Sequence, residues 1–325
     1  MSLYNKLKEF SVKENIIAGV GSAEPFYELK EYLKDREVPF VNFTPEERSE
    51  PGLIMKNANS IAAIGLSYNV VYKKINDKRS RGNMSAGAVD TDYHIVVMDK
   101  LKKLKDELLP EREVKMFSDT GPLSDRDVAL RCGLGTRGKN GSVINSEIGG
   151  MFFIGYMITD VEYEFWQAEE EKKVYCGECD RCVRACPNSA ISDGKCDYSR
   201  CISYITQKKG ALSDEEYKAI GRQIYGCDVC QRVCPYNKNF KVSENEYAYP
   251  DIEKLLNMTN REFKEIYGNT AAGWRGKRTL QRNALAVLGN IGDKKGIDIA
   301  LKYTKSEYED LRSAAEYAVK CIKES

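Results

Sequence analysis

Apolar positions in the first half of the chain alternate between helical and strand patterns. Short apolar runs predict strands, and charged segments with apolar residues three and four apart predict helices. The predicted strands cover residues 16–20, 60–68 and 114–117, and the predicted helices cover residues 3–15, 24–35, 92–104 and 123–132. The run at 60–68 is almost continuously apolar, which is typical of a central strand that is buried on both faces.

Residues 142–145 and 151–158 are also apolar and flank a Gly-Gly pair, so we expect them to form two strands that pair with each other. Segment 72–90 is basic and then rich in Gly, Ser and Asn, which predicts a long loop of the kind that is usually functional or disordered. Strand and helix therefore alternate over residues 1–165, which favours an α/β or α+β domain.

The pattern from about residue 250 onward is entirely helical. Residues 281–289 and 297–303 resemble one helical hairpin of the HEAT type. Capping boxes, in which Ser or Thr is followed three residues later by Glu, mark three predicted helix starts. They pair Ser213 with Glu216, Thr259 with Glu262, and Ser306 with Glu309.

The sequence thus predicts an α+β multidomain protein. An α/β domain at residues 1–165 is followed by a cysteine-rich domain at 166–248 and a HEAT-like helical domain at 249–325. The acidic stretch 169–171 is interpreted as a solvated linker into the cysteine-rich domain.

Seven cysteines fall in two runs in the second of these domains. The first run reads C-x-x-C-x-x-C-x-x-x-C-P, and the second reads C-x-x-C-x-x-x-C-P. The first spacing is the bacterial ferredoxin pattern for 4Fe-4S cubanes, in which three thiolates bind one cluster and the cysteine before proline binds the other. Two cubanes need eight ligands, and Cys201 lies between the runs and can complete the set.

We therefore predict two 4Fe-4S clusters. The ligands of one are Cys176, Cys179, Cys182 and Cys234, and those of the other are Cys186, Cys201, Cys227 and Cys230. Cys196 is the rival of Cys201 for the eighth position. Cys132 and Cys321 lie in helical patterns that are typical of core thiols.

Two structural alternatives fit these cysteines less well. Disulfides belong to oxidising compartments and usually to small secreted domains. Zinc ribbons use separated C-x-x-C pairs, without a third cysteine at the same spacing and a trailing Cys-Pro.

Composition excludes several broad classes. With a net charge of only +1, the chain as a whole does not attract polyanions. Any nucleic-acid site must therefore be a local basic patch. The N-terminus has no apolar signal core and no long apolar run follows, so we expect a cytoplasmic protein without a membrane partner. His94 is the single histidine, which rules out a His-rich metal site.

Two features of the leading domain could meet a ligand. Asp119 ends a predicted strand, where an α/β sheet usually presents ligands, although it could equally be a helix N-cap before Pro122. The turn at 135–140 is rich in glycine, and its amides and Lys139 could meet phosphate or amide groups. Plain turn chemistry also explains this segment, because its spacing is neither a P-loop nor G-x-G-x-x-G.

The two cysteine runs, with Arg200-Cys-Ile-Ser-Tyr-Ile-Thr between them, closely resemble the epoxyqueuosine reductase family. The double cluster motif alone is shared with other cobalamin reductases, including reductive dehalogenases. The fuller resemblance covers most of the chain from about residue 55. It extends to Asp92-Tyr-His, Asp119-Thr-Gly-Pro, Gly133-Leu-Gly with Gly138-Lys-Asn, and Gly273-Trp-Arg-Gly-Lys-Arg with Arg282-Asn.

This family is cobalamin-dependent and performs the last step of queuosine synthesis in tRNA. The resemblance implies a cobalamin-binding domain at 1–165, a ferredoxin-like double 4Fe-4S domain at 166–248, and a tRNA-binding tail at 249–325. It also implies a proton-donating aspartate, which corresponds to Asp119. Turning an epoxide into an alkene takes two electrons and expels an oxygen that needs a proton. Low-potential clusters can reduce cobalamin, and a general acid can protonate the leaving oxygen.

The resemblance also suggests binding residues. We expect base-off cobalamin, with His94 packing or hydrogen-bonding in the site rather than binding cobalt. The corrinoid contacts that we predict are Lys139, Asn140, Ser203, Tyr204 and Thr206. A low-potential electron donor would serve the enzyme, which we expect to be a monomer.

A short stretch without acidic residues in the tail holds four cations and one large aromatic. On composition it is a solvated helix start, whereas the resemblance favours contact with the tRNA anticodon stem-loop. The predicted nucleic-acid contacts are Trp274, Arg275, Lys277, Arg278 and Arg282.

The chain departs from the family at residues 85–90 and is somewhat short. A paralogue with another substrate therefore remains open, as do a dehalogenase-like cobalamin reductase of a small molecule and an electron-transfer protein without its own substrate. Bound corrinoid distinguishes the reductases from the electron-transfer protein, and a basic, aromatic tRNA surface distinguishes the two reductases.

Overall fold

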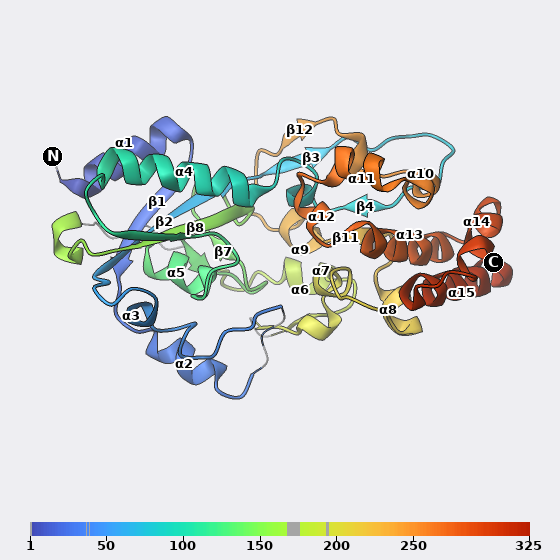
Figure 1. Cartoon of the computed structure of the whole chain (residues 1–325), viewed down its shortest axis with the longest axis horizontal. Coiled ribbons are helices and arrows are strands. Elements are labelled where there is room, and N and C mark those ends of the chain that lie inside the picture. The colour runs from blue at the N-terminus through green and yellow to red at the C-terminus, as the bar shows by residue number, and fades with distance from the viewer. Residues whose placement is uncertain (1, 37, 39, 168–175, 193–194) are drawn as a thin grey trace. The chain divides into compact units, whose positions relative to one another are not determined.

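The computed structural model describes residues 2–36, 38, 40–167, 176–192 and 195–325, and Figure 1 shows their helices and strands. The predicted linker at 169–171 lies outside these residues. None of the described helices is long and apolar enough to cross a membrane.

The chain divides into two compact units, and each draws on segments that are far apart in sequence. Unit 1 contains Met1–Asn69, His94–Asp180 and Pro235–Lys238, and unit 2 contains Val70–Tyr93, Arg181–Cys234 and Asn239–Ser325. The two units do not coincide with the three consecutive domains predicted at 1–165, 166–248 and 249–325. Those predicted boundaries remain an interpretation.

Unit 1 is built on a four-stranded sheet with the order β1-β2-β8-β5. All three strand pairs are antiparallel. The strands are β1 (Ile17–Ser22), β2 (Ser60–Ser67), β5 (Val114–Phe117) and β8 (Phe152–Thr159). Unit 1 is therefore α+β in character, since a doubly wound α/β fold would have parallel strands.

The expected pairing of residues 142–145 with 151–158 is wrong. β8 lies between β2 and β5 in the sheet, whereas β7 (Val143–Ile144) pairs with β6 (Thr136–Arg137) in a separate hairpin. β8 can occupy the middle of the sheet because most of its residues are buried.

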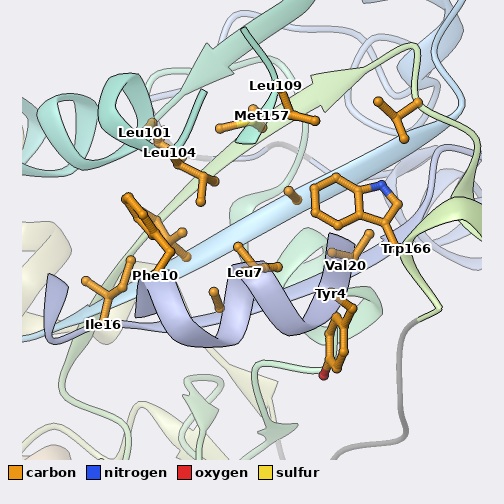
Figure 2. Close-up of a cluster of buried hydrophobic side chains, with 14 of the residues drawn as sticks. Tyr4, Leu7, Phe10, Ile16, Val20, Leu101, Leu104, Leu109, Met157 and Trp166 are labelled. Carbon is orange, nitrogen blue, oxygen red and sulfur yellow. The ribbon is translucent and has the colours of Figure 1, made fainter. Parts of the chain in front are cut away.

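Helices cover both faces of this sheet. α1 (Leu3–Glu14) and α4 (Tyr93–Leu108) pack on one face, where their apolar side chains belong to one buried cluster with Met157 and Trp166 (Figure 2). α5 (Asp125–Arg131) packs on the other face. Alternate residues of β2 enter the two clusters, which explains why its sequence is apolar almost throughout. The remaining helical segments of unit 1 are α2 (Tyr27–Leu33), α3 (Pro51–Ile54) and the 3₁₀ segment Tyr163–Trp166.

Segment 72–90, predicted as a loop, contains one short strand, and another strand ends at its first residue. β3 (Val70–Tyr72) pairs in parallel with β12 (Lys241–Ser243), and β4 (Asn83–Met84) pairs in parallel with β11 (Gln223–Tyr225). These long-range pairs satisfy backbone groups that an isolated loop would leave to water.

Short elements surround the cysteine runs of unit 2. A 3₁₀ turn at Tyr198–Arg200 precedes Cys201, and the run from Cys227 follows β11. The other elements are α6 (Arg181–Ala185), β9 (Ile191–Ser192), β10 (Lys195–Cys196), α7 (Ile202–Ile205), α8 (Asp214–Ala219) and α9 (Val229–Arg232).

The end of the chain is helical, as predicted. α13 (Lys277–Ile291) packs along α15 (Glu309–Glu324), and α14 (Ile297–Tyr303) also packs on α15. Gly289 allows the close approach of the two long helices, because a Cβ there would meet Ala318 Cα at 2.8 Å. The helices are α10 (Ile252–Asn257), α11 (Asn260–Tyr267), α12 (Ala271–Trp274), α13 (Lys277–Ile291), α14 (Ile297–Tyr303) and α15 (Glu309–Glu324).

Two of the three predicted capping boxes are present. Both reciprocal hydrogen bonds form at α8, between Ser213 and Glu216, and at α11, between Thr259 and Glu262. The third is wrong, because the Ser306 hydroxyl accepts the N–H of Tyr308 and α15 begins at the next residue.

Candidate functional site

Asp119 lies in a tight turn directly after β5. The N–H of Thr120 donates to the Ser118 carbonyl at 2.6 Å, which closes a three-residue turn with Asp119 at its centre. Asp119 has a φ of 58°, in the left-handed region that few residues other than glycine adopt. Its side chain remains 62% exposed. Backbone strain of this kind concentrates at functional sites, and an exposed carboxyl there can reach a substrate.

His94 stands beside this turn. It is the second residue of α4, and its Nε2 lies 3.6 Å from Asp119 Oδ2. The structure therefore brings the only imidazole of the chain to the carboxyl that the sequence nominated as a proton donor.

Two buried polar groups lie behind Asp119. Burial, reinforced by the negative charge of Asp119, raises the pKa of the Asp125 carboxyl to about 8. Burial also raises the pKa of the Tyr156 phenol, with a further contribution from Asp125. Neither residue was singled out from the sequence, because nothing in the pattern around them distinguishes them from a helix start and a buried strand residue.

The glycine-rich turn joins β6 to β7. The Nζ of Lys139 donates to the carbonyl of Gly177 at 2.7 Å, so this cation lies beside the first cysteine run. Asn140 is buried, and its Oδ1 accepts the N–H of Ser142 at 3.1 Å, which shapes its own turn. Both side chains thus have partners within unit 1.

Four of the predicted ligand thiols gather in unit 2. Burial raises the pKa of Cys227 to about 11 and that of Cys230 to about 12. The thiols of Cys201 and Cys186 add to both shifts, and that of Cys182 also adds to the shift of Cys230. Cys186 and Cys201 therefore lie within electrostatic range of both buried thiols. Such crowding of thiols in a buried place suits a cluster, whose iron would neutralise four thiolates.

The remaining ligand set is divided between the units. Cys176 and Cys179 belong to unit 1, and Cys182 and Cys234 belong to unit 2, so this set stays a prediction. No three His, Cys, Asp or Glu side chains of the described residues converge as they would around a single metal ion. This does not argue against a 4Fe-4S cluster, because each of its four thiolates binds a different iron and the thiolates lie farther apart than around a single metal ion.

Asp228 and Gly226 contact residues of the segment 85–90, where the sequence predicts a departure from the family pattern. The Asp228 carboxylate accepts the Ser85 hydroxyl at 2.6 Å and the Ala86 N–H at 2.7 Å. Gly226 has a φ of 68°, and a Cβ there would meet Ser85 Cβ at 2.5 Å. The departing segment therefore supports the loop that carries Cys227.

Thr206, which we predicted as a corrinoid contact, has a side chain that is enclosed by the protein. Thr206 is fully buried, and its hydroxyl donates to the Ile202 carbonyl and accepts the N–H of Gly226. Ser203 and Tyr204, which precede it in α7, are only partly buried and stay predicted contacts.

Arg282 is wrongly predicted as a tRNA contact. Its side chain is fully buried in α13, and its guanidinium donates to the carbonyls of Lys208 and Gly210 at 2.8 and 2.6 Å. The neighbouring Asn283 donates to the carbonyls of Thr206 and Ile224 at 2.7 and 2.8 Å. This pair fixes the loops that follow Cys201 and precede Cys227.

The other predicted nucleic-acid residues are more accessible. Trp274 is 63% exposed, and the Arg275 guanidinium lies 4.3 Å from the centre of its ring. Lys277 Nζ donates to the Met258 carbonyl, and Arg278 pairs with Asp310 at 3.1 Å. Trp274 and Arg275 therefore form the part of this segment best placed to meet a base.

Two family models match the chain. The model described as "4Fe-4S double cluster binding domain" matches residues 175–237, and "Epoxyqueuosine reductase QueG, DUF1730" matches residues 48–120. The epoxyqueuosine reductase of Bacillus anthracis is 38% identical over 323 residues, which cover 93% of this chain and 84% of the relative.

Solved epoxyqueuosine reductases share the fold. The Streptococcus thermophilus structure has a TM-score of 0.90 at 34% identity and covers 99% of this chain and 90% of its own. A Bacillus subtilis structure whose catalytic aspartate loop is swung out of the active site has a TM-score of 0.87 at 33% identity. The match covers 98% of this chain and 91% of the other. A structure with an epoxyqueuosine-modified tRNA-Tyr stem loop has a TM-score of 0.81 at 31% identity, and that match covers 99% of this chain and 100% of the other.

Proposed function

The chain belongs to the epoxyqueuosine reductase family, and from this we propose how its residues reduce epoxyqueuosine in tRNA. It is an oxidoreductase with a 4Fe-4S double cluster domain. The proposal adds the cofactor that reacts, the residue that gives the proton, and the surface that holds the tRNA. One observation carries this proposal. Nearly the whole chain is similar in structure to an epoxyqueuosine reductase that was solved with an epoxyqueuosine-modified tRNA stem loop.

We propose that cobalamin binds this chain base-off. When bound, cobalamin supplies the two-electron reductant for the epoxide. The donor set of the chain fits this form, because the single imidazole, on His94, already faces Asp119. Lys139, Asn140, Ser203 and Tyr204 remain the proposed contacts. Where their side chains already have partners in the protein, the contact would be made by main-chain groups.

Asp119 is proposed as the general acid. Its exposed carboxyl can approach the leaving oxygen, and desolvation by a bound ligand would favour the protonated form that it needs. His94 lies close enough to orient this carboxyl. The two protein groups thus hold a proton where the carbon–oxygen bond breaks.

The clusters are proposed to pass electrons singly from a low-potential donor to the site. One is held by Cys186, Cys201, Cys227 and Cys230, which the mutual electrostatic influence of these thiols supports. The ligands of the other are proposed to be Cys176, Cys179, Cys182 and Cys234.

The helical tail is proposed to bind the anticodon stem-loop through Trp274, Arg275, Lys277 and Arg278. An unstacked base can lie on the exposed indole or on the guanidinium beside it. The HEAT-like description of this tail, a cytoplasmic location and a monomeric state belong to the same proposal.

The test is anaerobic reconstitution with iron, sulfide and cobalamin, followed by assay on tRNA that carries epoxyqueuosine. The parent should form queuosine, and Asp119→Asn should keep both cofactors while turnover falls by about a hundredfold or more, the usual scale for a general acid. Asp99→Asn, an exposed carboxylate on α4, is the matched control and should leave turnover unchanged. Absence of turnover by a fully loaded parent would favour a small-molecule reductase instead.

A further inference from the structure

The turn that carries Asp119 is packed against β8 at its far end. A Cβ on Gly121 would meet the hydroxyl of Tyr156 at 2.5 Å and Phe117 Cβ at 2.7 Å. The rings of Phe117 and Tyr156 lie 5.3 Å apart. The turn therefore rests on an aromatic pair and has a left-handed residue, Asp119, at its centre.

Asp125 is placed where it can hold the near end of the same turn. It is the first residue of α5, and its carboxyl receives the main-chain N–H of Asp119. Its Oδ1 is buried and has no hydrogen-bond partner among the described residues. An unsatisfied buried polar atom costs about 1–3 kcal/mol, so this oxygen calls for an explanation.

We propose that Asp125 is a positioning residue that latches the Asp119 turn: its buried neutral carboxyl accepts the Asp119 N–H and keeps the Asp119 side chain in the site. The latch rests on the proposed role of Asp119 as general acid. The Bacillus subtilis relative, whose catalytic aspartate loop is swung out of the active site, supports the idea that such a loop has an open and a closed position.

The charges around Asp125 make the latch sensitive to pH. Burial and the nearby Asp119 carboxylate favour the proton on Asp125, while Arg48, Arg126 and the Asp119 N–H favour its loss. Tyr156 faces it from β8. The balance raises the pKa to about 8, so at neutral pH the carboxyl is mostly neutral. Above that pH the Asp125 carboxylate is ionised. Because water solvates the charge better than the protein interior does, the turn then favours an open position in which this carboxylate is hydrated.

The sign of the stability effect follows from this shift. The Asp125 pKa is about 8 in the folded chain and that of an unfolded aspartate is about 4, so the folded state binds the extra proton between these values. The stabilisation from Asp125 is complete below about pH 4 and is lost as the pH rises to about 8. Asp125→Asn, which stays neutral, should gain stability relative to the parent over this window.

The test compares Asp125→Asn and Asp125→Ala in the full, cluster-loaded chain. Hydrogen exchange of the peptide that covers residues 118–121 is measured at pH 6.5 and pH 9 and divided by the intrinsic exchange rate. The parent should be protected at the lower pH and lose protection at the higher pH. Asp125→Asn should be protected at both, because its carbonyl still accepts the Asp119 N–H, and Asp125→Ala should be unprotected at both.

Asp127→Asn is the matched control, because it removes a carboxylate from the same helix that instead pairs with Arg137 at 2.6 Å. It should exchange like the parent in residues 118–121. Melting temperatures from pH 4 to pH 9 give a second readout, in which both Asp125 variants should gain on the parent as the pH rises, because neither carries the carboxyl whose ionisation destabilises the parent. Unchanged exchange in Asp125→Ala, or a constant melting difference for Asp125→Asn, would overturn the latch.

Activity separates this inference from the proposed function. In Asp125→Ala, kcat should fall by about a hundredfold, the cost of misplacing a reacting group by about 1 Å, while KM for tRNA and iron content stay unchanged. If the parent has no activity but the exchange results hold, the latch stands and the proposed function fails. If the parent is active and the exchange results fail, the function stands without the latch.

Discussion

The Nε2 of His94 and the Oδ2 of Asp119 lie 3.6 Å apart, although His94 is the second residue of α4 and Asp119 follows β5. Both segments belong to unit 1, where α4 packs on the sheet that contains β5. The only imidazole of the chain is therefore placed to orient a carboxyl rather than to bind a metal.

This pairing predicts that His94 does not coordinate cobalt. In the cob(II)alamin form, the electron paramagnetic resonance spectra of the parent and of His94→Ala should be the same, and both should lack axial nitrogen coupling. Turnover of His94→Ala should nevertheless fall by up to about 100-fold, because the Asp119 carboxyl would lose the side chain that orients it. Nitrogen coupling that is present in the parent and absent in the variant would show that the imidazole is a cobalt ligand.

A second prediction concerns the eighth cluster ligand. The Cys201 thiol contributes to the raised pKa of both Cys227 and Cys230, which places it near two other predicted ligands of the same cluster. Anaerobic parent protein should hold about eight irons, the content of two cubanes. Cys201→Ala should drop to about four irons, and Cys196→Ala should keep about eight. Iron and sulfide analysis, together with the cluster spectra, decides whether Cys201 or Cys196 is the eighth ligand. Loss of iron in Cys196→Ala but not in Cys201→Ala would assign the position to Cys196.

A third prediction uses the close approach of Gly121 to Tyr156. Gly121→Ala forces a Cβ to within 2.5 Å of the phenol oxygen, so either the Asp119 turn or β8 must move. We expect a loss of about 1–3 kcal/mol in the free energy of unfolding, which is typical of overpacking, together with a fall in turnover at unchanged iron content. Gly52→Ala is the control, because a Cβ at Gly52 would meet nothing within 4 Å. Denaturant titrations in which both variants match the parent would contradict this packing.

Local patterns predicted much of the fold because the signals are local. The boundaries of α1 and β2, and the capping boxes of α8 and α11, follow from neighbouring residues alone. The partners of β3 and β4 did not follow, because their partner strands lie far along the chain and carry no complementary signal in the sequence. β8 was assigned to a hairpin for the same reason.

The site shows the same limit. Cysteine spacing predicts cluster chemistry because cubane ligation imposes that spacing on the chain. Arg282 has the same composition signal as a phosphate-binding arginine, and only the tertiary structure shows that it lies among carbonyls of the cluster domain. Asp125 has no sequence signal at all, since its significance comes from burial beside Asp119.

The last prediction concerns the tail. Arg275 stacks on the exposed Trp274, and Lys277 begins α13 nearby. If these residues contact phosphates, the affinity for tRNA should fall with salt, and each lost contact should flatten the slope of log K against log salt by about one unit. The double variant Arg275→Ala with Lys277→Ala should therefore bind tRNA more weakly and with a slope that is shallower by up to about two units, while iron and cobalt contents stay unchanged.

The matched control is Lys294→Ala with Lys295→Ala, which removes the same charge from an exposed 3₁₀ turn. Because this control changes net charge equally, any general attraction to a polyanion would weaken alike in both double variants. A flattened slope only in the Arg275 and Lys277 variant would locate the phosphate contacts at that segment. Equal losses in both variants would instead indicate diffuse attraction, and unchanged binding in both would exclude this part of the tail as the tRNA surface, leaving the nucleic-acid contacts to other residues of the chain.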